Sequence, residues 1–111
     1  MVEITTHKEE DIYSVVVDGE VDASSSILLD NEIRSALESE TKVLVDLSAL
    51  TYISSAGLGV FVSHLEEIEK RGISLALFGL SESVLQVFSL LGLQALLNIA
   101  EDKNEAIKAV S

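Results

Sequence analysis

The stretch VLVDLSALTYISSAGLGVF, residues 43–61, contains the change of hydrophobic period that decides the fold. Its first five residues are almost wholly apolar, which is typical of a strand buried on both faces. A short polar link leads to Ser54 and Ser55, and from there apolar residues recur at helical spacing. A second apolar run, ISLALFG, follows at 73–79. Strand, helix and strand with short links predict a parallel βαβ unit over residues 43–79.

The flanking sequence predicts the rest of the sheet and its helices. Residues 2–7 and 11–18 are rich in β-branched side chains, so we expect an antiparallel hairpin ahead of the βαβ unit. We expect helices over 26–39, 55–71, 82–91 and 103–110, and a short edge strand within 95–99. Together these elements predict one α/β domain over residues 1–111, with a mixed four- or five-stranded sheet and about four helices.

The composition restricts the class of partner. Seven basic residues against nineteen acidic ones give a formal net charge of −12, which disfavours nucleic acid and anionic membranes. No apolar run approaches the ~20 residues of a membrane span. The first residues lack the basic and apolar regions of a secretory signal, so we expect a cytoplasmic protein. The absence of cysteine excludes disulfides and thiol catalysis.

The two serines at the predicted helix start allow two interpretations. A serine at the N-cap satisfies free backbone N–H groups and contributes about 1 kcal/mol, but this explains only one of Ser54 and Ser55. The other could be a contact point that accepts a phosphate, since helix N-termini favour negative charge. We expect Asp22 and Asp46 to lie close by and to strengthen the local negative field.

The next residues of this helix are unusually small. Glycine costs ~1 kcal/mol against alanine in a helix, so Gly57 and Gly59 need a reason. Either another backbone approaches closely, or the helix packs tightly on a strand, and the sequence leaves both open. We expect Leu58 and Val60 to add apolar surface beside the serines.

An enzymatic role finds little support in the residues. A nucleophilic serine needs a base and an oxyanion site, but the chain has only His7 and His64 and no G-x-S-x-G motif. His64 lies nine residues after Ser55, too far along the same helix to reach it, and we expect it at the surface or half-buried. No metal site and no cofactor are predicted, because the two histidines are isolated.

At this point the chain resembles the STAS domain family, and within it the bacterial anti-sigma factor antagonists. Residues 46–61, DLSALTYISSAGLGVF, resemble the family's signature, and GEVDASSS at 19–26 resembles its Gly-Glu-Leu/Val-Asp loop. The resemblance covers essentially the whole chain. It implies a switch without catalysis, in which the unmodified protein binds an anti-sigma factor that is also a serine kinase.

The resemblance also implies site residues and partners. Phosphorylation of Ser55 would release the anti-sigma kinase, and a metal-dependent serine phosphatase would reset the switch. By alignment the contact surface comprises Asp22, Ser54, Ser55, Gly57, Leu58 and Gly59. Ser54 stands where the family often has aspartate, so Ser54 is the alternative acceptor, and a phospho-independent adaptor subunit of a transport or signalling complex is the alternative function. We expect a monomer.

Overall fold

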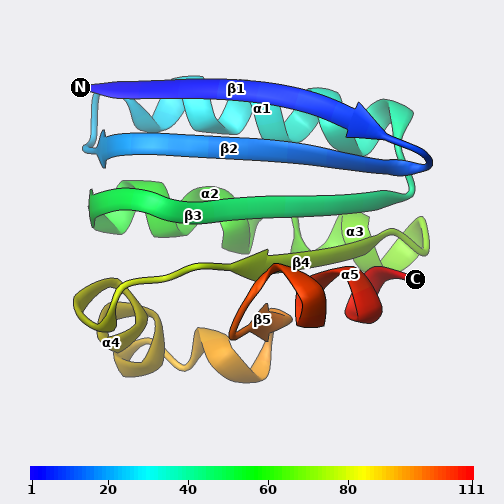
Figure 1. Cartoon of the computed structure of the whole chain (residues 1–111). Coiled ribbons are helices and arrows are strands. Elements are labelled where there is room, and N and C mark those ends of the chain that lie inside the picture. The colour runs from blue at the N-terminus through cyan, green and yellow to red at the C-terminus, as the bar shows by residue number, and fades with distance from the viewer.

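Five strands form one mixed sheet in the order β1-β2-β3-β4-β5 (Figure 1). The computed structural model describes all residues 1–111. The strands are β1 (Val2–Glu9), β2 (Ile12–Val21), β3 (Lys42–Ile53), β4 (Ser74–Phe78) and β5 (Ile99–Ala100). β1 pairs antiparallel with β2, and every other neighbouring pair is parallel. The predicted hairpin and the parallel βαβ unit are therefore confirmed.

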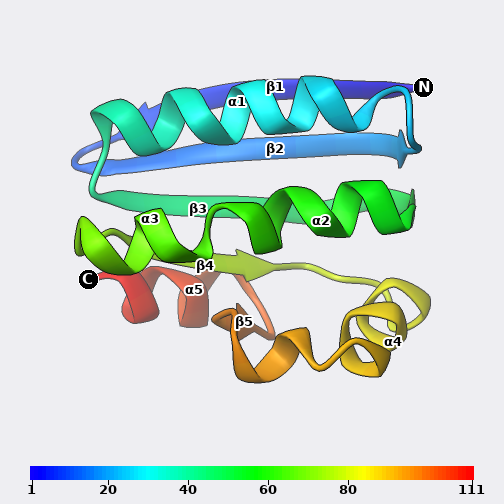
Figure 2. The same cartoon turned by 180° about the vertical axis from the view of Figure 1, so that it is seen from behind.

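The helices cover the two faces of the sheet unequally. They are α1 (Ser26–Ser39), α2 (Ser55–Ser63), α3 (Leu65–Lys70), α4 (Glu82–Leu90) and α5 (Lys103–Val110), with a short 3-10 turn at Leu93–Ala95. α1, α2 and α3 lie on one face, whereas α5 lies on the other, over β4 and part of β3 (Figures 1 and 2). The second face is therefore uncovered over β1 and β2.

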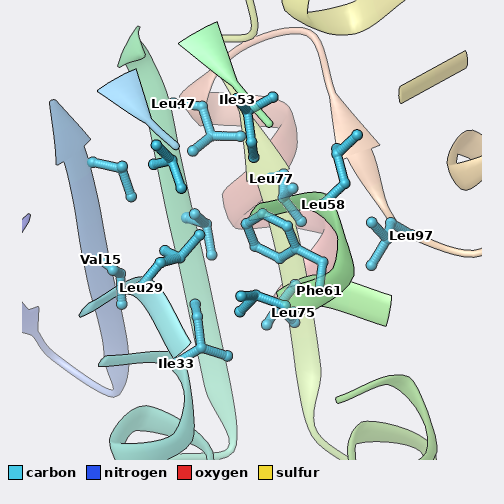
Figure 3. Packing of buried hydrophobic residues seen from close by; sticks show 14 of the residues in the cluster. Val15, Leu29, Ile33, Leu47, Ile53, Leu58, Phe61, Leu75, Leu77 and Leu97 are labelled. Carbon is cyan, nitrogen blue, oxygen red and sulfur yellow. The ribbon is translucent and has the colours of Figure 1, made fainter. Parts of the chain in front are cut away.

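The main core lies between the sheet and the face covered by α1 and α2. Phe61 of α2 packs there among leucines and isoleucines from α1, β3 and β4 (Figure 3). A smaller core joins Leu44, Ala76 and Phe78 of the sheet to Ala106 and Val110 of α5. Apolar residues on both faces of β3 and β4 explain why these strands are continuous apolar runs in the sequence.

Two strands are longer than predicted. The polar link expected after residue 47 is strand, since β3 continues to Ile53, and β2 continues past Asp18 to Val21. The two extensions pair with each other in the parallel ladder between β2 and β3. Register shifts in this ladder disturb the simple alternation of side chains. Gly19 sits in this irregular part at φ 105, a backbone conformation that favours glycine.

The helix predicted over 55–71 is interrupted at His64, where α2 ends and α3 begins. His64 is buried, so the expectation of a surface or half-buried histidine is wrong. Its Nε2 lies 2.8 Å from Oδ1 of Asp30 on α1, and its Nδ1 lies 3.8 Å from Oε1 of Glu67. The interruption thus coincides with a polar contact between helices that lie far apart in the sequence. The edge strand expected within 95–99 is also displaced, because β5 consists of only Ile99 and Ala100.

Candidate functional site

The candidate site lies where β2 and β3 end at the same edge of the sheet. The two strands run parallel and end level with each other, since Val21 of β2 is paired with Ile53 of β3. The backbone N–H of Ser54 donates a hydrogen bond of 2.8 Å to the carbonyl oxygen of Val21. The loop before α1 and the start of α2 are therefore joined, and both helices begin at this end of the molecule (Figure 2).

The two serines at the start of α2 have different roles. Ser54 is the N-cap, and its Oγ accepts a hydrogen bond of 3.2 Å from the backbone N–H of Gly57. Ser55 is the first residue of α2 and is exposed, and its hydroxyl makes no hydrogen bond within the protein. Capping therefore accounts for Ser54 alone, and it leaves the Ser55 hydroxyl free for contact with another molecule.

The two glycines of α2 also differ. A Cβ atom on Gly57 would lie 2.7 Å from Cγ1 of Ile53 and 2.8 Å from Cγ1 of Val21, closer than real Cβ atoms approach. Gly57 is thus required for packing of the helix on the strands. A Cβ atom on Gly59 would meet nothing within 4 Å, and Gly59 is exposed. Nothing inside the domain explains the second glycine.

The expectation that Leu58 and Val60 add apolar surface is wrong. Leu58 is 2% exposed and Val60 is 7% exposed, and both belong to the main core. Gly57 is buried as well, so neither it nor Leu58 can form the contact surface that the resemblance implied. The reason is geometric: α2 packs flat against the sheet, and Leu58 lies three residues before buried Phe61, on the same side of the helix. The exposed side consists of Ser55, Ala56, Gly59, Val62 and Ser63.

Asp22 lies directly after Val21 and is held by its own loop. Its Oδ1 accepts hydrogen bonds of 2.9 Å from the backbone N–H of Ser25 and from the hydroxyls of Ser24 and Ser25. The Ser25 N–H above all, then these hydroxyls, lower the pKa of Asp22 to about 2. The carboxylate is therefore ionised at neutral pH. It lies next to Val21, whose carbonyl oxygen accepts the hydrogen bond from the Ser54 N–H.

Asp46 does not belong to this site. It is paired with Val16 and Phe78 in the middle of the sheet, and its Oδ1 accepts hydrogen bonds from the backbone N–H and the hydroxyl of Ser48. The rest of β3 separates it from Ser54, a length of roughly 25 Å. The expectation that Asp46 lies near Asp22 fails because the sequence did not reveal how far β3 extends.

The first turn of α1 adds apolar residues that sequence reasoning missed. Ile27 is 64% exposed and Leu28 is 53% exposed, and they follow the Asp22 loop directly. α1 and α2 lie side by side (Figure 2). The available signal was the position of Ile27 and Leu28 off the buried stripe of Leu29, Ile33 and Leu37. We call Asp22, Ile27, Ser55, Ala56, Gly59 and Val62 the contact face.

Catalytic groups are not gathered at Ser55. His64 lies at the opposite end of α2 and is engaged with Asp30, and His7 lies on β1 at the far side of β2. No group of three or more histidine, cysteine, aspartate or glutamate residues is arranged to hold a metal ion. None of the helices is both long and apolar enough to cross a membrane.

The fold and the site define a small α/β domain that presents a free helix-terminal serine on a partly apolar face. The sequence model of the STAS domain matches residues 3–106, so the chain belongs to the STAS domain family. The chain is 33% identical over 103 residues to the anti-sigma-B factor antagonist of Listeria monocytogenes, which covers 88% of this chain and 87% of that protein.

Solved structures show the same fold. The crystal structure of an anti-sigma factor antagonist from Mycobacterium paratuberculosis matches with a TM-score of 0.90 at 21% identity, over 99% of this chain and 94% of that one. The phosphorylated form of the Bacillus cell fate determinant SpoIIAA matches with a TM-score of 0.73 at 20% identity, over 98% and 100%. The prediction of a STAS-like fold is confirmed.

Proposed function

We propose that this protein is an anti-sigma factor antagonist that acts by binding, without catalysis of its own. Its unphosphorylated contact face binds an anti-sigma factor that is also a serine kinase, and that kinase phosphorylates Ser55 to end the complex. A metal-dependent serine phosphatase restores the binding form. The kinship with anti-sigma-B factor antagonists supports the class of partner, and the site geometry supports Ser55 as the residue on which the switch depends.

The single observation that carries the proposal is the free hydroxyl of Ser55. A kinase must bring this oxygen into its own active site, which requires an exposed side chain without internal hydrogen bonds. Ser55 meets both conditions. The alternative acceptor, Ser54, is half-buried and its Oγ is engaged with the N–H of Gly57, so phosphorylation there would remove the helix cap.

The surrounding charges explain why a phosphate would change binding rather than folding. A phosphoserine carries about 1.5 to 2 negative charges, and the N-terminus of α2 tolerates them. Five of the seven basic residues are already in ion pairs with acidic side chains, and the other two, Lys103 and Lys108, lie on α5 across the sheet. No lysine or arginine side chain is therefore free near Ser55 to neutralise a phosphate there. The new charge would remain on the contact face beside ionised Asp22.

The proposal is tested by binding and by phosphate mapping. The purified protein is mixed with its cognate anti-sigma factor, and affinity is measured for wild type, Ser55→Ala, Ser55→Asp and Asn104→Asp. The last variant is a matched control, because it also places one carboxylate at an exposed position in the first turn of a helix, but on α5. We expect Ser55→Ala and Asn104→Asp to bind like wild type, whereas Ser55→Asp weakens binding about tenfold or more.

Incubation with ATP should then place one phosphate on Ser55, as located by mass spectrometry, and wild type should dissociate while Ser55→Ala stays bound. A phosphate found on Ser54, or Ser55→Asp binding as tightly as wild type, contradicts the proposed switch. In the second case a phospho-independent adaptor becomes the better description.

A further inference from the structure

β1 is the outermost strand on one side of the sheet, and it pairs only with β2 (Figure 1). The strand is eight residues long, Val2–Glu9, and its pairing with β2 has no register shift. α1 packs on one face of β1 and β2 and leaves the hydrogen-bonding edge of β1 open (Figure 2). A long regular edge can add a further strand, which many proteins prevent with a proline, a bulge or a very short strand. β1 has none of these three features.

The hydrogen bonds to β2 determine which backbone groups of β1 point outward. Glu9 and Ile12 flank a two-residue turn, so they form a hydrogen-bonded pair. Bonded and non-bonded pairs alternate along an antiparallel ladder, and the odd-numbered residues of β1 therefore bond to β2. Met1 follows the same pattern, since its carbonyl oxygen accepts a hydrogen bond of 3.1 Å from the Glu20 N–H. The outward-pointing N–H and C=O groups belong to the even-numbered residues, which are Val2, Ile4, Thr6 and Lys8.

The side chains of β1 alternate between the two faces of the sheet. Val2 and Ile4 pack against the main core, so the even-numbered side chains lie on the face of α1. The odd-numbered side chains of Glu3, Thr5 and His7 are exposed on the other face, which α5 leaves uncovered over β1. Side chains directly opposite each other across two strands share a face. A strand that continues this sheet with its faces aligned must therefore place odd-numbered residues opposite odd-numbered ones when it is a second copy of β1.

The charges of β1 select one register for such a pair. Two copies related by a two-fold axis perpendicular to the sheet pair antiparallel, and only two registers use nearly the whole strand. With the axis at Thr6, Glu3 faces Glu9 of the second copy, and like charges directly opposite are destabilising. With the axis at Thr5, Glu3 faces His7 of the second copy and Thr5 faces its own counterpart, and both pairs are favourable. The outward-pointing backbone groups then meet in two kinds of pair, Val2 with Lys8 and Ile4 with Thr6.

We propose that this protein forms a symmetric dimer in which two β1 strands pair antiparallel about Thr5 and join the two sheets into one. About eight backbone hydrogen bonds link the copies. The occupant of the edge is a second copy, because β1 itself supplies the complementary side chains in the register that its free backbone groups allow. The proposal departs from the monomer expected from the sequence. It is independent of the proposed switch, because β2 separates β1 from β3, which leads to Ser55.

The size and charge of the interface set the expected affinity. A single pair of strands buries less than the roughly 1,200 Å² of a standard interface. Each chain also carries a formal net charge of −12, so the two copies repel each other. We therefore expect a weak dimer with a Kd of roughly 10 to 500 μM. The measurements need an ionic strength of about 0.15 M, at which exposed charges more than about 8 Å apart are largely screened.

The experiment combines sedimentation equilibrium with amide hydrogen exchange of the full chain at protein concentrations from about 10 μM to about 1 mM. We expect the average mass to rise from that of a monomer towards that of a dimer. The alternation along β1 gives the sharper readout. Amides of the outward-pointing residues Val2, Ile4, Thr6 and Lys8 should gain protection as the concentration rises. Amides of Glu3, Thr5 and His7 bond to β2 and should show the same protection at every concentration.

Three variants separate the backbone contribution from the side-chain contribution. Thr6→Pro removes an outward N–H that β2 does not use, so the fold should persist and the dimer should be lost. His7→Glu places a second carboxylate opposite Glu3 in both symmetry-related pairs and should weaken dimerisation about tenfold or more. Combining Glu3→His with His7→Glu exchanges the two side chains and should restore the wild-type affinity. Asn104→Asp adds the same charge at an exposed position on α5, and this matched control should dimerise like wild type.

Thermal unfolding of each variant at low concentration checks that its monomer is folded, and the charge variants keep the test decisive if Thr6→Pro does not fold. Three results would overturn the inference. The first is a monomer at every concentration up to about 1 mM. The second is protection of the outward-pointing amides that does not change with concentration. The third is a charge-exchanged variant that dimerises as weakly as His7→Glu, because Glu3 and His7 would then not face each other.

Discussion

The two glycines of α2 can be compared by replacing each with alanine, because the gain in helix propensity is then the same for both variants. Replacing glycine by alanine within a helix gains about 1 kcal/mol of helix propensity, and this gain applies equally to Gly57→Ala and Gly59→Ala. At position 59 the added methyl group meets nothing within 4 Å, so the whole gain should appear as stability. At position 57 the methyl would lie 2.7 Å from Ile53 and 2.8 Å from Val21, both buried.

Overpacking of this kind in a core costs about 1 to 3 kcal/mol. We therefore expect Gly59→Ala to be more stable than wild type by about 0.5 to 1 kcal/mol, with a rise in Tm of roughly 2 to 6 °C. Gly57→Ala should be less stable than Gly59→Ala by about 1 to 3 kcal/mol, because only the steric cost distinguishes the two.

The measurement is urea denaturation of the three proteins under one set of conditions, with the m-values compared to check that the unfolding transition is unchanged. If Gly57→Ala is as stable as Gly59→Ala, the close packing of α2 on β2 and β3 is misjudged. The same Gly59→Ala protein should bind the anti-sigma factor more weakly despite its stability, since a methyl group would then occupy the contact face. Unchanged binding would remove Gly59 from that face.

Three further predictions concern the cap, the buried histidine and the loop carboxylate. Ser54→Ala should lower the free energy of unfolding by about 1 kcal/mol through loss of the α2 cap, whereas Ser55→Ala should change it by less than about 0.5 kcal/mol. Equal effects of the two substitutions in urea denaturation would refute the different roles assigned to the two serines. A double-mutant cycle of His64→Ala with Asp30→Ala should give a coupling of about 0.5 to 3 kcal/mol, and additive effects would show that the 2.8 Å contact adds no stability. Asp22 has a pKa of about 2 when folded, below its unfolded value, so its ionised form stabilises the folded state above pH of about 4 and this contribution disappears as the pH falls through about 2. The stability difference between wild type and Asp22→Ala should therefore narrow over that range in acid titrations, and a constant difference would contradict the hydrogen bonds assigned to the carboxylate.

Local chemistry made much of the fold predictable. α1 and α5 have the predicted bounds, 26–39 and 103–110. The buried stripe of Leu29, Ile33 and Leu37 at helical spacing marks α1, whereas a side-chain cap marks the start of α5. Oδ1 of Asp102 accepts a hydrogen bond of 2.9 Å from the backbone N–H of Glu105 and so caps α5. The apolar runs at 43–47 and 73–79 predicted strands covered on both faces, and the main core on one face of the sheet and the smaller core on the other confirm that prediction.

The candidate site was predictable only in part. Its position after β3 and the presence of two serines follow from the sequence, because parallel strands end at a common edge where loops collect. Which serine caps the helix depends on the backbone at the turn, where Ser54 is extended and Ser55 is already helical. The sequence also could not orient α2, since Leu58 and Val60 are as apolar as exposed Val62.

The sequence alone determined the βαβ frame, the acidic character and the helix-terminal serines, because periodicity, charge and capping act over a few neighbouring residues. Tertiary structure decided the roles of individual residues: Gly57 packs against the strands, Gly59 is open to solvent, and His64 is held by Asp30. Each of these depends on atoms brought together from distant parts of the chain. The register between β2 and β3 and the side on which α5 packs place those atoms, and neither is encoded in a local pattern.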